Sequence, residues 1–213
     1  MNKTDHEFTR LEIKKKQAEK RNLLSSFFIT LLIGVAFQEM ILVLRDEIKQ
    51  SGFELSSLLL GLIFLFVAIR FFVGNQLHLS SESFLSVSGV LWLYDLLVII
   101  IQSIVLILMG SFSTIEASVS SSIGFYECLI VLYTIDVVWI ISQWFLGQLS
   151  DKWKRESVPW PWGILNSFLI ISFLILWLLL RDPFSINGIL WLFILNLLGF
   201  VADLVLVDYY DAI

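Results

Sequence analysis

The chain has 213 residues, of which 58% are hydrophobic, and its mean hydropathy is +0.86. This composition excludes an ordinary soluble domain, because soluble proteins are only about half apolar. The formal net charge is −5, from 14 Lys and Arg against 19 Asp and Glu, and no nucleic-acid partner is predicted.

Six segments are long and apolar enough to cross a membrane as helices, which takes about 20 residues at 1.5 Å each. We therefore predict an all-α, polytopic membrane protein with six transmembrane helices. Its expected parts are a basic, helical tail (1–22), a transmembrane domain (23–207) and a short C-terminus (208–213). The predicted spans are Leu23–Leu44, Leu55–Val73, Gly89–Met109, Ile123–Leu146, Trp160–Leu180 and Ile186–Val207.

Lys and Arg are concentrated before the first span and between the fourth and fifth spans. The positive-inside bias places both segments, and hence both termini, in the cytoplasm, so we expect a multi-pass protein of the plasma (inner) membrane. These basic residues would contact anionic lipid headgroups or a cytosolic partner protein. They are Lys14, Lys15, Lys16, Lys20, Arg21, Lys152, Lys154 and Arg155.

Along the chain, the tail before the first span contains no Gly or Pro between residues 5 and 22 and is expected to run as a helix into that span. The second span carries Arg70, the only Lys or Arg inside any predicted span. Gly74 and Asn75 follow it and read as a helix stop, which would leave Arg70 close enough to the interface to extend its side chain toward water.

Acidic and amide side chains occur in the later spans. Asp95 lies near the start of the third, Asp136 in the middle of the fourth, Asn166 in the fifth and Asp203 in the sixth. A carboxylate at the centre of a membrane helix costs at least ~2.5 to 3.5 kcal/mol on insertion scales. Asp136 therefore needs a partner, a proton or a functional role.

Counting ~1.5 Å per residue from each span's centre places Arg70, Asp95, Asn166 and Asp203 at one depth, with Asp136 near the midplane. One Arg satisfies at most two carboxylates, so this polar core carries surplus negative charge and favours a cation, proton or amine. The alternative is that Arg70 pairs with one Asp as a clip between helices, while the other carboxylates are hydrated.

The sequence contains few signals for metal, cofactor or catalysis. Its two histidines have no metal-ligand spacing, so neither a metal nor another cofactor is predicted. Tyr94-Asp95 matches one half of the Tyr-Asp and Gly-x-Gly-Asp pair of intramembrane aspartyl proteases, but the second half is missing. We therefore do not expect an enzyme.

The first functional prediction is a cation or proton channel or transporter that works as a homo-oligomer. Asp136 would be the midplane site, Asp95 and Asp203 inner relay groups, and Arg70 the balancing charge. One alternative is a membrane sensor or effector subunit that docks a cytosolic protein, for example in a bacterial anti-phage defence system. A second is an intramembrane enzyme, which needs two carboxylates close to one substrate.

Overall fold

The computed structural model describes residues 3–52, 54–80, 89–112, 119–149, 158–180 and 185–211. Within these ranges, six helices are long and apolar enough to span a membrane, which confirms the predicted all-α, six-span fold. The helices are α1 (Lys3–Ser51), α2 (Leu55–Ser80), α4 (Gly89–Ser111), α5 (Val119–Leu149), α6 (Trp160–Leu179) and α7 (Ile186–Asp211).

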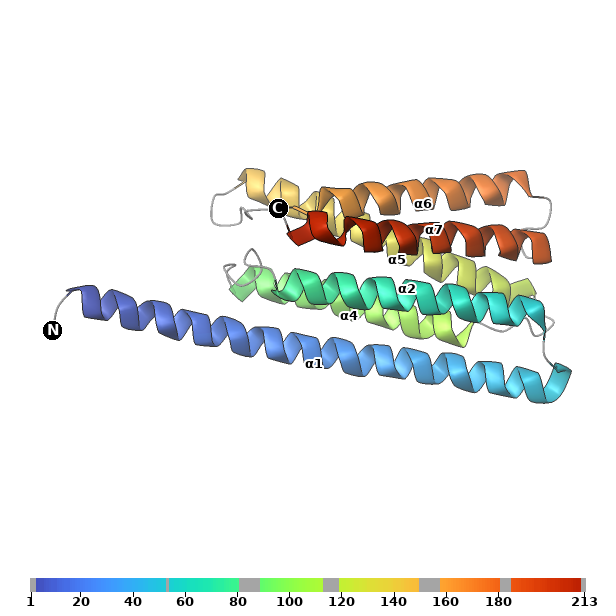
Figure 1. Ribbon diagram of the computed structural model, residues 1–213, viewed down its shortest axis with the longest axis horizontal. Coiled ribbons are helices and arrows are strands. Elements are labelled where there is room, and N and C mark those ends of the chain that lie inside the picture. Colours follow the sequence, from blue (N-terminus) through green and yellow to red (C-terminus); the bar gives the residue numbers. More distant parts are fainter. Residues whose placement is uncertain are drawn as a thin grey trace.

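Successive helices run in opposite directions, so both termini lie at the same end of the bundle, which we call the N-terminal end (Figure 1). The opposite end is called the far end. The helices pack in a closed ring in the order α1, α4, α5, α6, α7 and α2, which returns to α1. Two of the neighbouring pairs in this ring, α1 with α4 and α2 with α7, are not consecutive in the chain.

Helix α1 includes both the basic tail and the first span, because it begins at Lys3 and continues without a break to Ser51. Its 49 residues correspond to roughly 74 Å, and it extends beyond the other helices at the N-terminal end (Figure 1). The residues that it buries recur at helical spacing and form one stripe against α2 and α4. They include Ser25, Ile29, Ile33, Ala36 and Met40.

Helix α2 does not stop at Gly74 and Asn75, so this prediction was wrong. The helix continues to Ser80, and Gly52, between α1 and α2, is the glycine with a positive φ, of 84°. A glycine that ends a helix commonly adopts that left-handed conformation. The extension moves the centre of α2 to the region of Ala68, so that Arg70 lies about 4 Å from the centre of its helix.

The core of the bundle is mostly apolar toward the far end, although Glu47 and Ser57 are buried there and hydrogen-bond to each other. This part of the core contains large side chains that are at most 1% exposed and that come from α2, α4, α5 and α6. They include Phe64, Met109, Phe125, Leu129 and Phe173. Polar side chains are buried between this apolar layer and the N-terminal end.

Candidate functional site: a buried polar cluster

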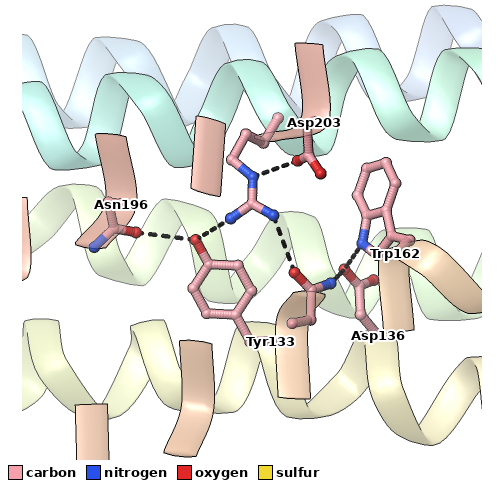
Figure 2. A network of polar contacts seen from close by, with 7 residues as sticks. Tyr133, Asp136, Trp162, Asn196 and Asp203 are labelled. Atoms are coloured by element: carbon pink, nitrogen blue, oxygen red, sulfur yellow. Dashed lines mark hydrogen bonds and ion pairs between the residues drawn. The ribbon is translucent and has the colours of Figure 1, made fainter. Parts of the chain in front are cut away.

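Polar side chains from α2, α5, α6 and α7 meet in the interior of the bundle (Figure 2). We define the polar cluster by its six hydrogen-bonded members: Arg70, Tyr133, Asp136, Asn166, Asn196 and Asp203. Four of the five residues predicted for the polar core are among them. The fifth, Asp95, lies elsewhere.

Arg70 is the centre of the cluster. Its Nε donates to Asp203 Oδ2 at 2.5 Å, its Nη1 to the Tyr133 hydroxyl at 2.7 Å, and its Nη2 to Asn166 Oδ1 at 3.1 Å. The residue is 3% exposed, so its side chain faces the bundle and does not extend to the interface. Removing either charge from such a buried pair costs about 3 to 5 kcal/mol, because the other charge is left unpaired.

Tyr133 extends the network from Arg70 to α7. Its hydroxyl donates to Asn196 Oδ1 at 2.9 Å, and Asn196 Nδ2 donates to the carbonyl of Leu192 at 2.8 Å. On the same helix, Gly199 leaves room for the guanidinium, because a Cβ there would lie 3.1 Å from Arg70 Nη1. The lack of a side chain at Gly199 therefore lets α7 pack closely against the Arg70 guanidinium.

Asp136 receives three hydrogen bonds, all from N–H donors. Gln102 Nε2 donates to Oδ1 at 2.5 Å, while Trp162 Nε1 and Asn166 Nδ2 donate to Oδ2 at 2.7 and 2.8 Å. A carboxylate has about four positions at which it accepts such bonds. Most of its lone pairs therefore accept hydrogen bonds from N–H groups. This arrangement stabilises the ionised carboxylate of Asp136 and repels a metal cation.

The two carboxylates belong to one network. Asn166 connects them, because its amide nitrogen donates to Asp136 while its oxygen accepts from Arg70, which in turn binds Asp203. One guanidinium thus balances two carboxylates, and ionisation of both leaves one negative charge. Among the described residues, no group of three or more His, Cys, Asp or Glu could hold a metal ion.

Asp95 lies in a second cluster, closer to the N-terminal end. Its Oδ1 accepts from Trp139 Nε1 at 3.0 Å, and its Oδ2 is 3.5 Å from His78 Nε2. The His78 ring meets the Trp139 ring edge to face at 4.7 Å. The prediction that Asp95 and Arg70 lie at the same depth was wrong. Because α2 extends to Ser80, His78, the partner of Asp95, lies on the same helix as Arg70 but about 12 Å nearer to the N-terminal end.

Four members or direct partners of the cluster were not predicted from the sequence: Tyr133, Asn196, Gln102 and Trp162. Helical spacing contains the signal for two of them, since residues three, four or seven apart share a face. Tyr133 precedes Asp136 by three residues, and Asn196 precedes Asp203 by seven. A search for polar or aromatic side chains on the face of each Asp would have found these two.

The structure describes the side chains of only some of the basic residues that were predicted to contact lipid headgroups or a partner protein. Lys16 and Lys20 are exposed, and Arg21 lies over the Trp92 ring at 5.6 Å from its centroid. The side chains of Lys14 and Lys15 are outside the described part of the chain, as are Lys152, Lys154 and Arg155 entirely. Their predicted contacts with lipid headgroups or a partner stay predictions.

Comparisons of the chain with protein-family models, with curated proteins and with solved structures return no match. A functional assignment therefore depends on the chemistry of the residues described above.

Proposed function

We propose that this protein moves protons across a membrane, with Asp136 as the proton-binding group. The observation that supports this best is the position of Asp136, which is 4% exposed in the middle of a membrane-spanning helix. Its carboxylate is linked by hydrogen bonds to Arg70 and Asp203 through Asn166. Buried ionisable groups of this kind are typical of proton relays in membrane proteins.

A proton fits this site better than a metal cation does. The three N–H groups around Asp136 occupy the lone pairs that a metal would need. About one lone-pair position of the carboxylate accepts no hydrogen bond, so a proton can bind there. Protonation removes the negative charge that the three N–H groups stabilise, and would therefore weaken the contacts of Asp136 with α4 and α6.

The arrangement supports a transporter in preference to an open pore. Toward the far end, the polar cluster gives way to the apolar layer that includes Phe64, Phe125 and Phe173. Water has no polar partners in such a layer, so the layer would block proton movement in this conformation. A second conformation, in which this layer opens, completes the proposed cycle.

The proposal is tested by reconstituting the full chain in liposomes that contain a pH-sensitive dye and imposing a proton gradient. We expect Asp136→Asn to reduce proton flux to the level of protein-free liposomes, because an amide does not bind and release a proton at neutral pH. The matched control is Asp46→Asn, which changes an exposed carboxylate at the far end of α1. It should keep the original flux.

Each variant is first checked for a single monodisperse species, so that loss of flux is not loss of fold. Undiminished flux in a correctly folded Asp136→Asn, Asp203→Asn double variant would exclude the proposal, since the network would then contain no ionisable carboxylate.

A second candidate, a membrane subunit that docks a cytosolic protein, is favoured by α1. This helix continues beyond the bundle (Figure 1), and its exposed Lys16 and Lys20 lie in the segment that the positive-inside bias assigns to the cytoplasm. Deleting residues 3–20, which removes Lys16 and Lys20, should abolish co-purification of such a partner and leave proton flux unchanged. Partner binding that survives the deletion, or a tail that is protected from cytoplasmic protease, would rule this candidate out.

The intramembrane enzyme is not proposed. It required Asp95 and Asp203 at one substrate, but Asp95 contacts His78 and Trp139, whereas Asp203 contacts Arg70.

A further inference from the structure

The second polar cluster, nearer to the N-terminal end, lies where α2 reaches across the interior of the bundle. It consists of His78 from α2, Asp95 from α4 and Trp139 from α5. In the ring of helices the neighbours of α2 are α1 and α7, so His78 joins α2 to two helices that are not beside it in the ring.

The contact between His78 and Asp95 depends on charge. The carboxyl group accepts from Trp139 Nε1 at 3.0 Å, and its Oδ2 lies 3.5 Å from His78 Nε2. The second distance is long for a hydrogen bond, but two opposite charges at this separation attract each other strongly in a buried site. The contact is therefore strong only when the imidazole is protonated and the carboxyl group is ionised.

Burial makes the two charges depend on each other. Asp95 is 0% exposed, and an ionised carboxylate inside a membrane protein is costly unless a positive charge accompanies it. The His78 side chain is 11% exposed, and histidine gains or loses a proton near neutral pH. Two ionisable groups this close titrate as a pair, so a proton on the imidazole and the negative charge of the carboxylate stabilise each other.

Trp139 positions both members of the pair. Its N–H donates to Asp95, while its ring meets the His78 ring edge to face, with the centroids 4.7 Å apart. One side chain of α5 thus orients the carboxylate and limits the positions that the imidazole can take.

Few other titratable groups of α4 and α5 approach this pair in the described part of the chain. Tyr94, next to Asp95 on α4, has its hydroxyl 2.5 Å from Ser142 Oγ of α5. Helix α5 carries no titratable residue from 137 to 149. From these two helices, Asp95 is therefore the charge that faces the imidazole.

The ring neighbours of α2 hold their charges in other contacts. On α1, Arg21 lies over the Trp92 ring, about 4.5 Å nearer to the N-terminal end than Asp95, and the described charged side chains before it are exposed. On α7, Asp203 pairs with Arg70, about two turns farther from this end. The charge state of the pair therefore depends chiefly on its own two members.

We propose that His78 and Asp95 form a second proton-binding site, separate from Asp136, which ties α2 to α4 when it holds one proton. Loss of that proton leaves a neutral imidazole, and a second proton neutralises the carboxylate. Either change removes the attraction, so this contact across the bundle weakens at both high and low pH. The site does not depend on the proposed transport of protons, and it is tested without a proton gradient.

The first test is nitrogen NMR of the imidazole in the full chain, on a His6→Gln background in which His78 is the only histidine. At about pH 6.5 an unperturbed histidine is half protonated. We expect His78 to be mostly protonated there, and the ratio of charged to neutral imidazole to fall at least about tenfold in Asp95→Asn, because a nearby carboxylate favours the imidazolium. Equal ratios, or a neutral imidazole in the chain with Asp95, would overturn the shared proton.

Tyr94→Phe is the matched control, because it removes a polar contact between α4 and α5 next to Asp95 and changes neither member of the pair. It should leave the ratio of charged to neutral His78 unchanged. A fall as large as that in Asp95→Asn would show that the imidazole responds to helix packing and not to the carboxylate, and would count against the site.

The second test is a double-mutant cycle for unfolding in mixed micelles, with His78→Gln, Asp95→Asn and both together. The coupling should be at least about tenfold in the unfolding equilibrium constant at about pH 6.5. At about pH 9, where the imidazole is neutral, it should fall below about twofold. The same coupling at both pH values would contradict a contact that depends on a proton.

This inference and the proposed function fail in different ways. A pair that behaves as expected in a protein that moves no protons would contradict the proposed function and leave the second site intact. A pair without coupling in a protein that does move protons would contradict the second site alone.

Discussion

At the scale of single residues, Tyr133 connects the charged half of the polar cluster to α7. Its hydroxyl accepts from Arg70 and donates to Asn196, so it uses both of its hydrogen-bonding functions. The guanidinium carbon also lies over its ring, 5.1 Å from the centroid. Loss of this one oxygen would remove the partner of two buried atoms, Arg70 Nη1 and Asn196 Oδ1.

Tyr133→Phe should therefore destabilise the protein by about 1.7 kcal/mol, near the upper limit measured for single polar contacts in membrane proteins. Tyr126→Phe is the matched control, because Tyr126 is two turns away on α5 and donates one bond, to the carbonyl of Phe173 at 2.8 Å. It should cost about 0.6 kcal/mol, the average for such contacts. Unfolding by denaturant in mixed micelles measures both, and equal losses would contradict the role given to Tyr133.

Single residues were predictable where their type is rare in a membrane span. Arg70 and Asp136 stand out in apolar segments, and both lie in the cluster. Tyr133 and Trp162 did not stand out, because aromatic side chains are common in membrane helices and at their interfaces. Gly74 carries no signal for this packing role in the sequence, since the role depends on the indole that packs against it.

At the scale of helices, α1 and α4 approach closely at Gly110. A Cβ on Gly110 would lie 2.9 Å from the carbonyl oxygen of Ala36 and 3.4 Å from the amide nitrogen of Met40. These are backbone atoms, so they cannot move aside as a flexible side chain does. Close approach at small residues is a general basis of helix association in membranes.

We expect Gly110→Ala to push α1 away from α4 and lower the free energy of unfolding by about 1 to 3 kcal/mol, the usual cost of overpacking. The control is Gly34→Ala on the exposed side of α1, where an added Cβ meets nothing within 4 Å. That substitution should be neutral or stabilise the helix by up to about 1 kcal/mol. A Gly110→Ala protein as stable as the Gly34→Ala protein would disprove the close contact.

The helices themselves followed from hydropathy and length, and the main error was the end of α2. Polar residues after Val73 looked like an exit from the membrane, but neighbouring helices satisfy them. Asn75 donates to Gln102 Oε1 at 3.5 Å, and Gln76 accepts from the Ser26 hydroxyl at 3.0 Å. Hydropathy cannot distinguish a polar residue that faces water from one that faces another helix.

At the scale of the whole molecule, the order of helices around the ring was not predictable. Each span is apolar on most of its surface, so it has no strongly amphipathic face to indicate its neighbours. The polar residues define some of the inward faces, but they do not say that α1 packs on α4 or α2 on α7. Orientation in the membrane and homo-oligomer formation stay predictions from charge and size.

The ring order has a consequence for synthesis, because it joins the second membrane helix to the last one. Arg70 and its counter-ion Asp203 are 133 residues apart in the chain. At about 5 to 20 residues per second, the ribosome needs roughly 7 to 27 s to make that stretch. For this time α2 must wait as a helix with an unmatched positive charge, held by lipid headgroups, by the insertion machinery or by water. Until its final helix is made, the newborn protein therefore holds Arg70 without its ion-pair partner.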